Sequence, residues 1–127
     1  MNDVIFEFYR GDTYTRDFII KGWSLPISNV YFTVKEKVDN KKACLQKMLN
    51  NGIVLVDTSE EGNTYNLRIC CTDTECLKVN IDYVFDIEIH SVVEEETVKR
   101  TIATGILRLL PSATKSCNEV VLRWIQA

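Results

Sequence analysis

The chain has 127 residues with a formal net charge of −3, and 46% of its residues are hydrophobic and 26% charged. This size and composition predict one globular domain that buries a core without metal or disulfide staples. The weakly acidic charge argues against a nucleic-acid-binding surface, and no apolar run approaches the length that crosses a membrane.

The N-terminal third alternates between apolar and polar side chains, with turn residues between the runs. Strand side chains point to opposite faces in turn, so this period of two predicts β structure. We expect strands at 4–9, 14–20 and 30–35, with a tight hairpin turn at Arg10-Gly11-Asp12 and a break at Pro26. The Arg-Gly-Asp triplet is interpreted as that turn and not as an adhesion motif.

The segment "KKACLQKMLNNG", residues 41–52, has a different pattern. Cys44, Leu45, Met48 and Leu49 recur at helical spacing, and Asn51-Gly52 is a typical helix stop. The sequence therefore predicts a short helix here.

The rest of the chain returns to period two. An apolar run at 52–56 and alternation over 65–71 predict two strands, and 83–90 predicts the clearest strand, with Tyr83, Phe85, Ile87 and Ile89 facing inward. A charged hairpin tip follows, and then a long strand over 98–111, in which we expect a β-bulge at Gly105.

"RICCTDTEC", residues 68–76, holds three of the five cysteines. Cys70 and Cys71 would point to opposite faces of a strand, and Cys44, His90 and Cys117 form no second ligand pair of the kind that zinc sites use. Thr72 and Glu75 have capping-box spacing, which favours a short helical turn pinned by Leu77. We therefore expect five reduced cysteines, no metal and no cofactor.

Catalytic patterns are weak in this sequence. His90 is the single histidine and lies at a strand end without a motif around a nucleophile. Asp86 and Glu88 resemble paired carboxylates but are more typical of the solvent face of a half-buried strand. No phosphate-binding or EF-hand motif occurs. The chain is expected not to be an enzyme.

The order of several landmarks resembles a known family. A "GDT" turn, "LPISNVYFTVKEK", "GIV", a "T-x-x-L" crossing turn, "YVFDIEI" and "TIATGILRLLPSAT" are similar to the N-terminal domain of bacteriophage baseplate upper proteins and related small tail proteins. The likeness spans about Phe8 to Thr114. The "KKACLQKMLNNG" insert, the five cysteines and the early end of the chain depart from the family pattern.

This resemblance implies an all-β fold, an antiparallel immunoglobulin-like β-sandwich with one or two short helical turns. It also implies a non-enzymatic protein of tail or baseplate assembly. Its expected partners are other tail or baseplate proteins, or further copies of this chain in a homo-oligomer. We expect no signal peptide, no membrane partner, and a route from the host cytoplasm into the virion tail. The alternative is a carbohydrate-recognition module, which would need Trp23, Tyr9 and Tyr14 around a groove; a core-edge role for Trp23 is the competing interpretation.

The C-terminal segment is the last feature. Residues 1–114 are predicted to form the sandwich, and residues 115–127 to form either a partner-binding segment or an extra edge strand. The residues expected to make contacts there are Val120, Leu122, Arg123, Trp124 and Ile125, with Val121 beside them. Dense apolar residues with Trp and Arg are typical of interface hot spots.

Overall fold

The computed structural model describes residues 4–113, and these residues form eight strands and one short helical turn. The strands are β1 (Val4–Tyr9), β2 (Tyr14–Ile20), β3 (Asn29–Lys35), β4 (Leu45–Leu49), β5 (Gly52–Ser59), β6 (Gly62–Ile69), β7 (Asp82–Val93) and β8 (Glu96–Leu110). A 3-10 helix, η1 (Cys71–Thr74), follows β6. The prediction of a nearly all-β protein is confirmed.

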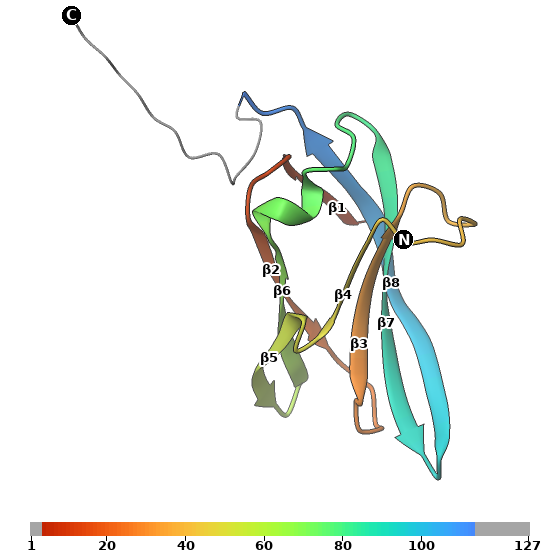
Figure 1. Cartoon of the computed structure of the whole chain (residues 1–127). Coiled ribbons are helices and arrows are strands. Elements are labelled where there is room, and N and C mark those ends of the chain that lie inside the picture. The colour runs from red at the N-terminus through yellow and green to blue at the C-terminus, as the bar shows by residue number, and fades with distance from the viewer. Residues whose placement is uncertain (1–3, 114–127) are drawn as a thin grey trace, which may run out of the picture.

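All eight strands belong to one mixed sheet in the order β1-β8-β7-β3-β4-β5-β6-β2. The sheet curls until it is nearly closed into a barrel, with β1 and β2 at its two ends (Figure 1). Two of its pairings are parallel, β1 with β8 and β4 with β5, so the expectation of a purely antiparallel arrangement is wrong. The pair β4 and β5 is short and rests on two residue pairs, Met48 with Gly52 and Leu49 with Ile53.

The core fills the inside of this curled sheet. In β3 and β7 every second residue is buried, as expected for strands with one face inside and one face outside. Tyr83, Phe85, Ile87 and Ile89 all lie on the inner face, which confirms the predicted register. The rings of Phe6, Phe32 and Phe85 form the aromatic centre, and the Phe6 and Phe85 centroids are 4.6 Å apart.

The gap between the two end strands is covered by side chains instead of hydrogen bonds. Tyr14 at the start of β2 stacks on Phe8 of β1 with ring centroids 4.4 Å apart, and its ring also contacts Phe6. Arg16 lies over the Phe6 ring at 5.2 Å. Because β1 and β2 do not pair, the turn between them does not make the hairpin that we predicted.

The Arg-Gly-Asp turn nevertheless has a clear structural role. The Gly11 amide donates a hydrogen bond to Oγ1 of the buried Thr74 at 2.9 Å, and Arg10 Nη1 donates to the Leu77 carbonyl at 3.3 Å. Gly11 has a φ of 89°, a conformation that favours glycine. The turn therefore ties the N-terminal strands to the crossing segment that contains η1.

The predicted helix over 41–52 is wrong. Residues 45–49 form β4, which pairs with β3 from Val34 opposite Leu45 to Tyr31 opposite Met48. Leu45 and Leu49 fit an alternating pattern as well as a helical one, and an isolated helix this short is marginal in water. Pairing with β3 supplies the backbone hydrogen bonds of this segment. The neighbouring strand therefore decides that residues 45–49 form a strand and not a helix.

Gly105 also has a different role from the predicted bulge. It pairs regularly with Phe85, and the register of the β7–β8 pair shifts elsewhere, where Ile87 and Glu88 face Ala103 and Thr101. A Cβ at Gly105 would contact the Phe85 ring and the carbonyl oxygen of Val4. Glycine is therefore needed because the Phe85 ring and β1 both approach the backbone closely.

The crossing turn predicted from "TDTECLK" is present as η1, and Leu77 packs against the core as expected. Its cap differs from the prediction: the Cys70 amide donates to Asp73 Oδ2 at 2.6 Å, so the capping box uses Cys70 and Asp73. Asp73 also binds Lys47 of β4 at 2.8 Å, and both side chains are mostly buried. This ion pair links β4 to the segment that follows β6.

The cysteine prediction is wrong in part. Cys44, Cys70 and Cys76 are free, as expected, whereas Cys71 is disulfide-bonded. Cys117 lies outside the described residues.

Candidate functional site

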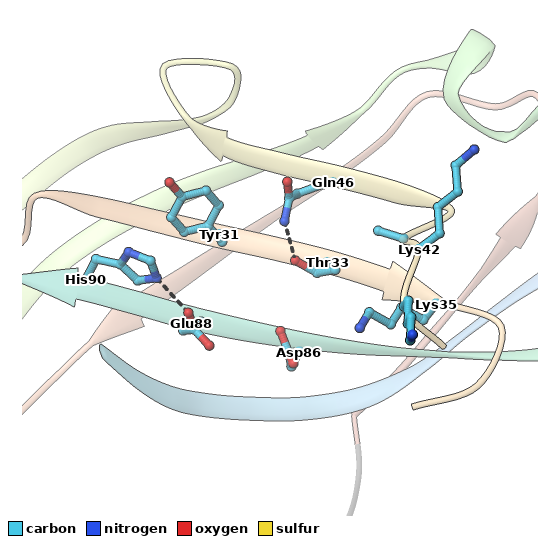
Figure 2. A pocket seen from close by; sticks show the side chains of 10 residues that line it. Tyr31, Thr33, Lys35, Lys42, Gln46, Asp86, Glu88 and His90 are labelled. Carbon is cyan, nitrogen blue, oxygen red and sulfur yellow. Dashed lines mark hydrogen bonds and ion pairs between the residues drawn. The ribbon is translucent and has the colours of Figure 1, made fainter. Parts of the chain in front are cut away.

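The outer face of β3, β4 and β7 carries a polar groove, and this groove is the main candidate site. It has a volume of about 550 Å³, and its lining residues are Tyr31, Thr33, Lys35, Lys41, Lys42, Ala43, Gln46, Asp86, Glu88 and His90. Figure 2 shows these side chains projecting from adjacent strands, with the segment that connects β3 to β4 at one end. Most of them occupy outward positions in strands whose inner positions form the core, and Lys41, Lys42 and Ala43 come from the connection between β3 and β4.

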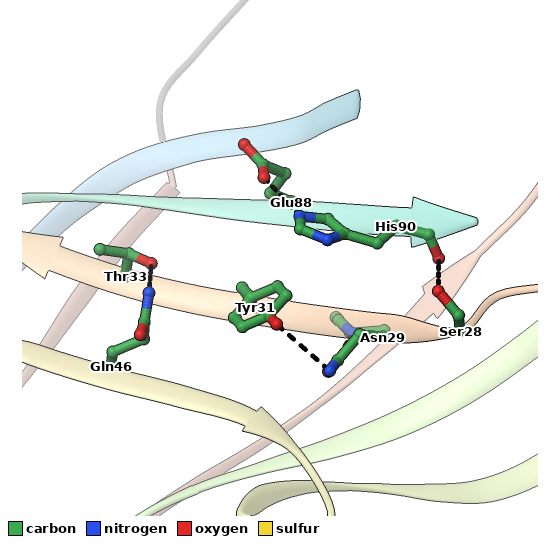
Figure 3. Close-up of polar contacts among 8 residues, drawn as sticks. Ser28, Asn29, Tyr31, Thr33, Gln46, Glu88 and His90 are labelled. Atoms are coloured by element: carbon green, nitrogen blue, oxygen red, sulfur yellow. Dashed lines mark hydrogen bonds and ion pairs between the residues drawn. The ribbon is translucent and has the colours of Figure 1, made fainter. Parts of the chain in front are cut away.

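The floor of the groove is fixed by cross-strand pairs. The registers place Tyr31 opposite Glu88 and Thr33 opposite both Asp86 and Gln46. Gln46 Nε2 donates to Thr33 Oγ1 at 3.0 Å, as drawn in Figures 2 and 3. These pairings place the polar side chains of three neighbouring strands on one face of the sheet.

His90 closes one end of the groove. Its Nε2 lies 2.6 Å from Glu88 Oε1, and its ring centroid is 4.6 Å from that of Tyr31. Its backbone carbonyl accepts hydrogen bonds from both the amide and the hydroxyl of Ser28, at 2.8 and 3.0 Å (Figure 3). With its ring held by Glu88 and Tyr31, His90 serves as a wall of the groove.

Asp86 and Glu88 are the two carboxylates that line the groove, and they differ in their partners. Within residues 4–113 no group donates a hydrogen bond to Asp86, and in Figure 2 it projects from β7 between Glu88 and Lys35. Partial burial, and then the negative charge of Glu88, raise the pKa of Asp86 above its ordinary value, while Lys35 opposes this rise. A ligand that donates a hydrogen bond to Asp86 would therefore stabilise its ionised form.

An apolar hollow of about 270 Å³ adjoins the groove. The two hollows share Thr33, Lys35 and Asp86. The remaining lining residues of the apolar hollow are Val38, Val84, Phe85, Thr104, Gly105 and Ile106. One side of the groove thus continues into a surface that suits a small apolar group.

A second candidate surface is the apolar edge of β5, which we define as Val54, Leu55 and Val56. These three consecutive side chains are 44%, 49% and 52% exposed. The pairing of β5 with β4 stops at Ile53, so from Val54 onward β5 is paired with β6 alone. A register shift between Leu55 and Asp57 marks a bulge at Val56, which shortens the stretch that could accept another strand.

The aromatic cluster of the carbohydrate hypothesis does not form from the predicted residues. Tyr9 and Tyr14 flank the turn at one end of β2, whereas Trp23 follows its other end. Trp23 is half-buried, packs against the core and donates from Nε1 to Oγ of the buried Ser91 at 2.8 Å. The core-edge interpretation of Trp23 is confirmed.

The predicted contact residues of the C-terminal segment are Val120, Leu122, Arg123, Trp124 and Ile125, and they lie outside the described residues. The sequence patterns single out Asp86, Glu88 and His90 but give no role to Tyr31 or Gln46. The polar positions of the three strands become a groove only once the strands are neighbours. A signal was present in the alternation of β3, whose outward residues are all polar or aromatic.

Neither a scan against protein-family models nor a search of curated proteins finds a match for this chain. In residues 4–113 no helix is long and apolar enough to cross a membrane. The same residues contain no group of three or more His, Cys, Asp and Glu side chains placed to hold a metal ion.

Proposed function

We propose that this chain is a non-enzymatic assembly module of a phage or prophage tail, which acts through contacts with other tail or baseplate proteins. The observation that carries the proposal is the apolar edge of β5. Three consecutive large apolar side chains, each about half exposed on a strand with one unpaired edge, are unusual on a monomer's surface and typical of a protein contact. The order of sequence landmarks resembles that of small tail proteins, and this resemblance is the reason for proposing a phage tail as the assembly.

The fold that goes with this proposal is an immunoglobulin-like sandwich. One layer would consist of β1, β8, β7, β3 and β4, and the other of β5, β6 and β2. Support comes from the β4–β5 link, which has only two residue pairs, and from the stacking of the two strand sets around one core (Figure 1). Residues 1–114 would be the sandwich and 115–127 a contact segment, in a protein made in the host cytoplasm and carried in the virion.

The test uses particles purified after induction of the strain that carries the gene. Mass spectrometry should detect the chain at a fixed ratio to the major tail protein. Deletion of the gene should yield particles with incomplete tails. If the purified particles lack the chain, the proposal is wrong.

A matched pair of variants tests the contact surface. Val56→Lys places a charge on the apolar edge, whereas Val92→Lys changes a valine of nearly equal exposure, 54%, near the β7–β8 turn. Both proteins should melt cooperatively, but only Val56→Lys should be depleted from particles, by about tenfold if the lost contact is worth about 1.4 kcal/mol. Equal incorporation of both variants would show that the β5 edge is not the contact.

A further inference from the structure

The polar groove carries charges of both signs in a small space. Asp86 and Glu88 lie on its floor, Lys35 ends β3, and Lys41 and Lys42 lie in the connection between β3 and β4. An anion such as phosphate would meet the two carboxylates, and a cation such as a guanidinium would meet the three ammonium groups. The charge pattern therefore disfavours a simple ion of either sign.

A ligand that both donates and accepts hydrogen bonds fits this pattern. Asp86 can only accept when ionised, and Lys35 can only donate. Two neighbouring hydroxyl groups can meet both needs, because one donates to the carboxylate and the other accepts from the ammonium group. Gln46 also lines the groove, and because its amide nitrogen donates to Thr33, its amide oxygen is left as a further acceptor.

The groove also offers apolar surface. The ring of Tyr31 lines it beside His90, and Val84 and Ile106 line the adjoining hollow together with Asp86. Sugar rings have apolar C–H faces, and many carry a methyl group in an acetamido or a 6-deoxy substituent. A zwitterionic amino acid would match the charges but would depend on ion pairs with lysines in an open groove, which contribute little.

We propose that the groove formed by Tyr31, Lys35, Gln46, Asp86 and the apolar hollow beside it is a binding site for a neutral saccharide that carries a methyl-bearing substituent. This activity is separate from the proposed assembly role. The site takes its ligand on the outer face of β3 and β7, away from the β5 edge, so the two functions can be tested independently.

The first experiment is an NMR titration of the ¹⁵N-labelled full-length chain. The saccharide probes are N-acetylglucosamine, rhamnose and glucose, and the charged probes are phosphate, arginine amide and alanine. N-acetylglucosamine or rhamnose should shift the amides of Thr33 and Asp86 and the side-chain amide of Gln46, with Kd on the order of millimolar, and glucose should bind more weakly.

Several results of this titration would overturn the proposal. One is an absence of shifts with all three sugars at 100-fold molar excess over about 1 mM protein. Others are shifts centred outside the groove, or shifts produced only by phosphate, arginine amide or alanine. Stronger binding of glucose than of both methyl-bearing sugars would overturn the role of the apolar hollow.

Variants separate the groove from nonspecific effects. Asp86→Ala removes the unpartnered acceptor and should weaken sugar binding by at least about tenfold, which is the loss of one good hydrogen bond. Asp57→Ala makes the same chemical change on exposed β5 and should leave Kd unchanged. Val84→Ser should remove the preference for the methyl-bearing sugars while glucose binding persists. Unchanged binding in Asp86→Ala, or an equal loss in Asp57→Ala, would reject the site.

Discussion

We call β1, β8, β7, β3 and β4 the five-strand half of the sheet, and β5, β6 and β2 the three-strand half. Both halves follow the same backbone rules, but they differ in the burial of their side chains. In the five-strand half, burial alternates along almost the whole of β3 and β7. In the three-strand half, β5 has one buried residue, Ile53, and every later residue is exposed. Leu55 shares the inner face with buried Tyr65, its cross-strand partner, yet is half exposed.

The difference shows that an apolar residue in a strand is buried only where other side chains pack against it. The Phe85 ring packs against Phe6 and Phe32 in the core, whereas β4 ends at Leu49 and leaves β5 after Ile53 with a neighbouring strand on one side only. β3 and β7 therefore bury more apolar surface than β5, whose Val54, Leu55 and Val56 stay about half exposed.

The largest expected effect compares one inner-face residue from each half. Phe85→Ala should lower the free energy of unfolding by about 3–5 kcal/mol, because it removes a buried ring and leaves a cavity. Leu55→Ala should lower it by less than about 1 kcal/mol, since half of that side chain is already in water. Urea denaturation gives both values. Glu88→Ala, on the outer face, is the control and should also cost little. Similar losses for Phe85→Ala and Leu55→Ala would mean that the two halves contribute equally.

The next effect concerns the ion pair that links β4 of the five-strand half to η1, which follows β6. Lys47→Met keeps the length of the side chain but leaves Asp73 without its cation, and should cost about 1.5–3 kcal/mol. A double-mutant cycle with Asp73→Asn should give a coupling energy of at least about 0.5 kcal/mol. Additive losses would show that Lys47 stabilises β4 by packing alone.

Hydrogen exchange sharpens the comparison without any substitution. Amides of β7 between Phe85 and Ile89 should exchange only through global unfolding, because both edges of the strand are paired. Amides of β5 after Ile53 should exchange through local opening, at rates at least about tenfold higher. Equal protection of β5 and β7 in the full-length chain would contradict the view that the β5 edge is open.

The smallest effect is the pH dependence caused by Asp86. Its pKa in the folded protein is raised above the ordinary 3.8, mainly by burial, so the folded state binds the proton more tightly than the unfolded state. This contribution to stability is present in full below 3.8 and is lost as pH rises through the raised pKa. Asp86→Asn should therefore have the higher urea midpoint at pH 7 and no such advantage at pH 3. A lower midpoint at pH 7 would show that ionised Asp86 is stabilised by its surroundings.

The sequence predicted β3 and β7 well for a physical reason. The alternation around Val30, Phe32 and Val34, and that from Tyr83 to Ile89, extends over enough residues to exclude a helix, and a half-buried strand has no other way to place its apolar residues. The end of β6 and the turn at η1 were also foreseeable, because Asp and Thr follow a strand there.

Other features depend on contacts that no local pattern records. β4 became a strand because β3 offered an edge, and Gly105 is required by a ring and by a carbonyl oxygen that are distant in the chain. The groove combines residues from three strands and a connecting segment, so its members could be named singly but not as one site. The prediction for Val120 to Ile125 stays a prediction.

The parallel pairing of β1 with β8 has a mechanical consequence. Val4 pairs with Gly105 and Tyr9 with Leu110, so the two strands run side by side in the same direction. A pulling force applied between the start of β1 and the end of β8 would slide one strand along the other and strain all their hydrogen bonds at once, instead of opening them one by one. The rate of forced unfolding in this direction is set by simultaneous rupture of the whole ladder. The pairing of β1 with β8, the first and last strands of the described residues, should therefore resist a force that pulls these two strands in opposite directions along their length.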